Sequence, residues 1–255
     1  MAEADKYRGQ IFLHRGDLTQ ARLSYEQALA EDRRGASPQV LSDTLGNLGN
    51  VCAMLGDYSE AARCYHEVLE IQRRQQDQSA IGQTLVNLGN LQAEAGHSER
   101  AKAYYLEALD ILERVKDNRA LGILYSTLAL QEAAAGSTNE AIGNFTKALE
   151  LHRVVGNEEG LATTYSQLGK TFLQAGKSAQ AEKCLNNASE HFIKLGNEPG
   201  EAAALRLLAD LYEQAGNRES AIRCLERVVA FDARYGLPQH TADRASLERL
   251  VQGDV

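Results

Sequence analysis

One feature of this sequence restricts the fold more than any other: a period of 40 residues that runs through almost the whole chain. Alanine recurs at this step, and a glycine stands at a constant distance before each alanine. Such a period is typical of repeat arrays, in which each unit buries its apolar face only against its neighbours. The two gap-free series are Ala21, Ala61, Ala101, Ala141, Ala181 and Ala221, and Gly16, Gly56, Gly96, Gly136, Gly176 and Gly216.

Each repeat unit is predicted to contain two helices. Ala61, Tyr65 and Leu69 are spaced by four residues and so share one helical face. Gly56 favours the left-handed conformation that ends a helix, and Asp57 is a good cap for the next one. Equivalent caps are expected at Asp17 and Ser137, each with an acidic or amide residue three positions later. First helices are expected near 2–15, 38–55, 78–95, 118–135, 158–175 and 198–215, and second helices near 18–32, 58–74, 98–114, 138–154, 178–194 and 218–234.

The sequence therefore predicts an all-α array of six helix-turn-helix units. We expect the whole chain, 1–255, to be one array that closes with a polar capping helix near 239–252, because a terminal repeat needs a cover. Gly49 and Ala61 are predicted to mark the closest approach of the two helices in a unit, with Tyr65 filling space against the next unit. The expected repeats are 1–36, 37–76, 77–116, 117–156, 157–196 and 197–236.

Composition excludes several classes of function. The formal net charge is −8, which argues against general affinity for nucleic acid or anionic membranes. No apolar run is long enough for a membrane span and no signal peptide opens the chain, so a cytoplasmic protein is expected. Neither a catalytic motif nor a metal-ligand pattern is present, so we expect no enzyme, no cofactor and no metal. The four cysteines are expected to be buried and unpaired: Cys52, Cys64, Cys184 and Cys224.

The order of Leu48-Gly49, Ala61 and Tyr65 resembles the tetratricopeptide repeat signature, and it recurs along all six units. The long unit is similar to the repeats of LGN/Pins-type adaptors, kinesin light chains and bacterial Rap-type regulators. This resemblance implies a right-handed superhelix. It also implies that the first helices line a concave surface, which usually holds a peptide or helix from a partner.

Asparagine inside these first helices needs an explanation, because its side chain competes for backbone hydrogen bonds. Asn50 and Asn90 share one repeat position, and Asn47 and Asn87 share another. In one interpretation their amides grip the backbone of a peptide in the groove. In the other they tie one helix to its neighbour. We favour the groove for Asn50 and Asn90, and both interpretations stay open for Asn47 and Asn87.

Following the equivalent positions along the chain extends the predicted groove. It is rich in amides early, apolar in the middle and charged late, which suits a partly extended peptide or an amphipathic helix. Leu130 could instead belong to an ordinary core. Besides the four asparagines, the candidate groove residues are Val86, Ser126, Leu130, Lys170, Arg206 and Asp210.

The predicted function is that of a non-catalytic interaction module, an adaptor or scaffold that binds a protein or peptide partner. One alternative is a peptide-sensing regulatory domain of a larger signalling protein. Another is a self-assembling scaffold, a homo-oligomer in which the groove takes the terminal helix of a second copy.

Overall fold

The computed structural model describes residues 2–252, and every element within them is an α-helix. The helix ends agree with the sequence prediction to within one residue, so the predicted all-α fold is confirmed. The helices are α1 (Ala2–His14), α2 (Leu18–Asp32), α3 (Pro38–Met54), α4 (Tyr58–Gln75), α5 (Gln78–Glu94), α6 (Ser98–Val115), α7 (Asn118–Ala134), α8 (Thr138–Val154), α9 (Glu158–Gln174), α10 (Ser178–Lys194), α11 (Glu198–Gln214), α12 (Arg218–Tyr235) and α13 (His240–Gln252).

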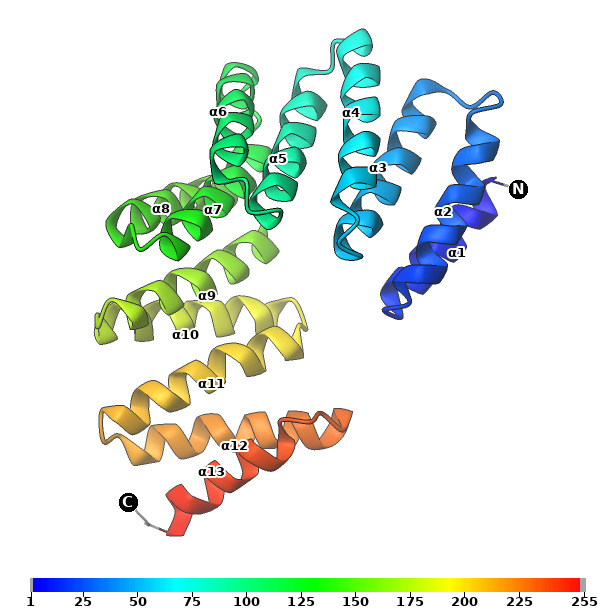
Figure 1. Cartoon of the computed structure of the whole chain (residues 1–255). Helices are drawn as coiled ribbons and strands as arrows, with labels where there is room; N and C mark the ends of the chain where they lie inside the picture. The colour runs from blue at the N-terminus through cyan, green and yellow to red at the C-terminus, as the bar shows by residue number, and fades with distance from the viewer. Residues whose placement is uncertain (1, 253–255) are drawn as a thin grey trace. The chain divides into compact units, whose positions relative to one another are not determined.

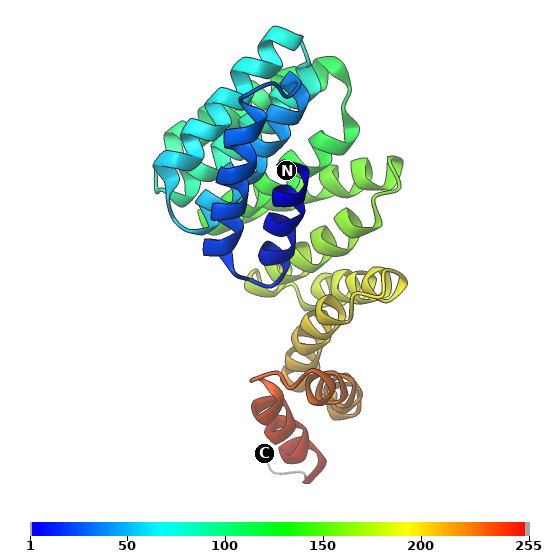
Figure 2. The same cartoon turned by 90° about the vertical axis from the view of Figure 1, so that its right-hand side faces the viewer.

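The chain divides into two compact units, and the division falls after Ala120, in the first turn of α7. In the first unit the helices pack in antiparallel pairs, α1 with α2, α3 with α4 and α5 with α6 (Figure 1). In the second unit α9 packs on α10 and α11 on α12. The last helix, α13, lies against α12, as Figure 2 shows at the orange and red end of the chain.

Local sequence signals account for the helix ends. Gly16, Gly56 and their four equivalents adopt φ values between 69 and 81°, the left-handed conformation predicted for them. Asp57 caps α4 as expected, since its carboxylate accepts from the backbone N–H of Glu60 at 3.2 Å. The cap predicted at Ser137 is wrong in detail, because that hydroxyl makes no capping hydrogen bond.

The packing inside a unit differs from the prediction in one respect. The Tyr65 ring covers Gly49 of its own unit, so closely that a methyl group at Gly49 would lie 2.9 Å from the ring. Tyr25 covers Gly9 in the same way. The glycine therefore makes room for the aromatic ring of its own unit, whereas the prediction had placed Tyr65 against the next unit.

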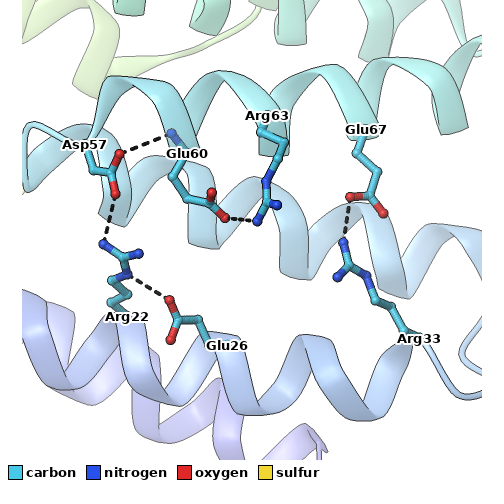
Figure 3. Close-up of polar contacts among 7 residues, drawn as sticks. All are labelled: Arg22, Glu26, Arg33, Asp57, Glu60, Arg63 and Glu67. Carbon is cyan, nitrogen blue, oxygen red and sulfur yellow. Dashed lines mark hydrogen bonds and ion pairs between the residues drawn. The ribbon is translucent and has the colours of Figure 1, made fainter.

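Ion pairs link successive second helices of the first unit. Arg22 of α2 contacts Asp57 at 3.1 Å, and Arg33 contacts Glu67 of α4 at 2.7 Å (Figure 3). Arg73 and Glu107 repeat the pattern between α4 and α6 at 3.5 Å. Three arginines thus link neighbouring repeats, whereas Arg63, Arg74 and Arg114 pair with carboxylates of their own helix.

The four cysteines are buried and free, as predicted. Within residues 2–252 no cluster of three or more possible metal ligands occurs. The same residues contain no helix with the length and apolar character needed to cross a bilayer.

Candidate peptide-binding groove

A polar groove runs along the first helices of the first unit. Two adjoining hollows form it, of about 430 and 200 Å³, and they share Asn50, Tyr65 and Asn87. We call the combined feature the amide groove. Its lining residues are Gln39, Ser42, Asp43, Gly46, Asn47, Asn50, Ala53 and Met54 of α3, Tyr65, Val68 and Gln72 of α4, and Ala80, Gln83, Thr84, Asn87, Asn90, Leu91 and Glu94 of α5.

All four predicted asparagines line this groove, but two of them also have a structural role. The Tyr65 hydroxyl donates to Asn50 Oδ1 at 2.6 Å, and the Tyr105 hydroxyl donates to Asn90 Oδ1 at 2.8 Å. Burial raises the pKa of each tyrosine to about 12, with a further contribution from the Glu94 carboxylate. Both hydroxyls therefore stay protonated donors.

These bonds add a structural role to the predicted groove position of Asn50 and Asn90. They tie the two helices of a single unit together, while both side chains still line the groove. Because Oδ1 is engaged by tyrosine, the NH₂ group of each amide is the part left to donate into the groove.

Asn47 and Asn87 are the freer pair. Both side chains are exposed, and among the described residues neither amide hydrogen-bonds another side chain. The interpretation that they join neighbouring helices is therefore wrong. Each presents a donor and an acceptor to the groove.

The floor of the groove is polar and internally bonded. Thr84 donates to Gln72 Oε1 at 2.8 Å, which orients the amide of Gln72 between α4 and α5. At one end Gln39 donates to Asp43 at 3.0 Å. At the other end Glu94 is exposed. The groove is thus lined by amides and hydroxyls with a carboxylate toward each end.

Val86 does not present a binding surface. It is 5% exposed and belongs to the core between helices. The prediction of an apolar groove position here is wrong, because the side chain points into the helix packing rather than toward the open face.

Three of the predicted residues of the second unit are placed as follows. Leu130 is 42% exposed, so the alternative that it is core is wrong. The Ser126 hydroxyl donates to the Gly122 carbonyl and is hydrogen-bonded to the Thr164 hydroxyl, both at 3.0 Å. Its hydrogen bonds are thus made inside the second unit. Lys170 is exposed.

Arg206 and Asp210 lie where α11 meets the last helix. Arg206 pairs with the fully buried Asp232 at 2.6 Å and with Asp243 of α13 at 2.8 Å. Arg206 is thus not available to a ligand, contrary to the prediction. Asp210 is exposed on α11, and partial desolvation together with Glu213 and Asp243 raises the pKa of its carboxyl group.

Two family models, both described as tetratricopeptide repeat, match this chain. One matches residues 40–114, 120–194 and 174–234, and the other matches residues 1–38. The chain belongs to the tetratricopeptide repeat family. The comparison with curated proteins found no significant match.

Solved structures of other tetratricopeptide arrays share the fold at low sequence identity. A signal transduction ATPase with a tetratricopeptide repeat sensor, from Pyrococcus horikoshii, has 18% identity and a TM-score of 0.79 over 100% of this chain and 39% of that one. BtubC (BKLC) from P. vanneervenii, a kinesin-light-chain-like array, has 21% identity and a TM-score of 0.60, covering 76% and 80% of the two chains.

A Rap protein complexed with the competence and sporulation factor has 13% identity and a TM-score of 0.70, covering 98% of this chain and 74% of that one. The predicted resemblance to Rap-type and kinesin-light-chain-type arrays is therefore confirmed at the level of fold.

The sequence prediction found the four asparagines of this groove but missed its other lining residues, including the two charged ones. Asp43 lies seven residues before Asn50, and Glu94 lies four residues after Asn90. Both separations return to the same helical face. Extending the repeat positions by one more turn in each direction would have found them.

Proposed function

We propose that the first unit of this protein binds an extended segment of a partner protein in the amide groove, and that the role is non-catalytic. The observation that carries the proposal is the row of four asparagine amides along the open face of α3 and α5. Tetratricopeptide repeats generally mediate protein–protein interactions, which supports the same conclusion.

The chemistry of the row suits a peptide backbone. Asn50 and Asn90 offer NH₂ donors to peptide carbonyls, because their oxygens are held by tyrosine. Asn47 and Asn87 offer both a donor and an acceptor. Backbone recognition of this kind requires an extended ligand, since a helix has already satisfied its own backbone groups.

The test compares two double variants against a selected ligand. Linear peptides of about twelve residues span more than one repeat when extended at roughly 3.3 Å per residue, so a library of that length is selected on the wild-type chain. We expect Asn47→Ala with Asn87→Ala to weaken the selected peptides about tenfold or more, because several hydrogen bonds are lost. Isothermal titration calorimetry measures the change.

A matched control removes two exposed amides elsewhere in the same unit, Gln27→Ala on α2 and Gln75→Ala on α4. This variant should bind as the wild type does. Equal affinity of the groove variant and the control variant would contradict the proposal.

A second candidate is a peptide-sensing domain of a larger signalling protein. It is favoured by the similarity to the sensor-bearing ATPase, of which this chain spans 39%, and to the Rap protein complexed with a factor. Hydrogen exchange across both units with and without a selected peptide distinguishes it. Sensing requires protection to change outside α3–α5, whereas simple docking confines the change to those helices.

The remaining alternative, self-assembly through a swapped terminal helix, finds no support in the packing of α13. Leu250 of α13 joins the core cluster of α11 and α12, and Arg218 donates to the Val251 carbonyl at 2.8 Å. This helix is engaged by its own chain.

A further inference from the structure

The walls of the amide groove have an unusual charge distribution. Helices α3 and α5 contain no lysine, arginine or histidine, and no lining residue of the groove is cationic. The two charged lining residues are Asp43 and Glu94. The basic residues of α4 and α6, the second helices of the same two repeats, lie outside the groove lining.

Asp43 and Glu94 are the carboxylates that line the groove, and in the described part of the chain neither has a cation partner. The other carboxylates described in the first unit without a cation lie outside the groove lining: Asp17, Asp77, Glu99 and Asp117. Asp57, Glu67 and Glu107 each contact an arginine of the preceding repeat. Asp43 accepts one bond from Gln39, and among the described residues neither Asp43 nor Glu94 pairs with a cation. An incoming chain would therefore have to provide the countercharges.

We infer that the ligand of the amide groove is an extended, basic peptide segment with two lysine or arginine side chains, one for Asp43 and one for Glu94. This inference rests on the proposed function and adds to it the charge of the partner. Acidic and phosphorylated segments are disfavoured, because the groove offers them no cation and would repel them from both ends.

The positions of the carboxylates also set the spacing of the two basic residues. Met54 is the repeat equivalent of Glu94 and lies eleven residues after Asp43. Eleven residues of α-helix correspond to roughly 16 Å along the axis. The step from α3 to α5 adds a sideways separation, so the two carboxylates lie more than about 16 Å apart. An extended chain needs at least about five residues to cover that distance, and the basic side chains should therefore be at least about five residues apart.

Fluorescence anisotropy with labelled, capped peptides tests this inference. The probe is a short peptide of serine, alanine and threonine that carries two lysines at the inferred spacing. The comparison peptides replace both lysines by glutamine, replace both by glutamate, or place the lysines next to each other. We expect the spaced dilysine peptide to bind about tenfold more tightly than the glutamine peptide at low salt, and less so as salt is added.

The protein variants separate a local effect from general attraction to an acidic protein. Asp43→Asn with Glu94→Gln should abolish the preference for lysine. Glu70→Gln with Asp110→Asn removes the same charge from exposed sites on α4 and α6 and should leave the preference intact. If both double variants lose it equally, the inference is overturned.

The outcomes also separate the inference from the function on which it rests. If glutamine and lysine peptides bind equally, and both depend on Asn47 and Asn87, the groove binds peptides but the basic preference is wrong. If no peptide of any charge binds, the proposed function fails and the inference fails with it.

Discussion

The open face of the first unit and the end of the second unit use the same repeat positions in opposite ways. In the first unit, the position of Asn50 holds amides whose oxygens accept from Tyr65 and Tyr105, and the rest of the face stays open. In the second unit the tyrosine position holds Phe145, Leu185 and Leu225, and the asparagine position holds Leu130, Lys170 and Asp210.

The difference shows that the tyrosine and the amide belong together. A buried tyrosine hydroxyl needs a partner, and the asparagine directly after the glycine under the tyrosine ring provides it. Where the aromatic hydroxyl is absent, the amide is absent as well. Asn50 and Asn90 are therefore explained first by their hydrogen bonds inside the repeat. Only their NH₂ groups are left for a ligand.

At the end of the second unit, charged side chains of α11 form ion pairs with α12 and α13. Arg206 is held by Asp232 and Asp243, and Glu213 is held by Arg249 of α13 at 2.7 Å. Carboxylates of α12 and α13 thus pair with Arg206, which the sequence pattern had assigned to a ligand. The groove of the first unit has no such internal cover.

The largest expected effect tests the closed end. Arg206→Ala should destabilise the second unit by about 3–5 kcal/mol, because it leaves the buried Asp232 carboxylate without its cation. Urea unfolding followed by circular dichroism measures the loss. Arg249→Ala breaks a partly exposed pair and should cost about 1 kcal/mol or less. Similar losses for the two variants would mean that the buried pair is not special.

An intermediate effect tests the contact between tyrosine and glycine in the first unit. Gly49→Ala should cost about 1–3 kcal/mol, because the added methyl group overlaps the Tyr65 ring. Gly46→Ala, one turn earlier on α3, meets no atom within 4 Å and should be neutral or stabilise the helix by up to about 1 kcal/mol. Thermal unfolding of both variants is the measurement. A Gly49 variant as stable as the Gly46 variant would remove the basis of the comparison.

The smallest effect separates the two asparagine pairs. Asn50→Ala with Asn90→Ala should lower the free energy of unfolding by about 1 kcal/mol per site, since each removes the acceptor of a tyrosine hydroxyl. Asn47→Ala with Asn87→Ala should change it by about 0.5 kcal/mol or less, as exposed substitutions usually do. Chemical denaturation measures both changes. A larger loss for the Asn47 and Asn87 variant than for the Asn50 and Asn90 variant would contradict this assignment of the structural role.

Much of the fold could be read from the residues because its signals are local. The ends of α4, for example, follow from Asp57 accepting from a backbone N–H three residues later and from Gly56 in the left-handed region. The candidate groove was harder to predict. Repeat positions place Asn47, Val86 and Arg206 on one general face, but they do not tell which of these side chains an adjacent helix covers.

The sequence by itself determined the period, the thirteen helices of the described residues, the unpaired cysteines and the family, because each depends on spacing along the chain or on short-range capping. Only the tertiary structure decided that the oxygen of Asn50 accepts a hydrogen bond from Tyr65, that Val86 is buried, and that Asp243 of α13 pairs with Arg206. Those outcomes depend on distances of a few ångströms between helices, which the pattern of a single helix does not contain.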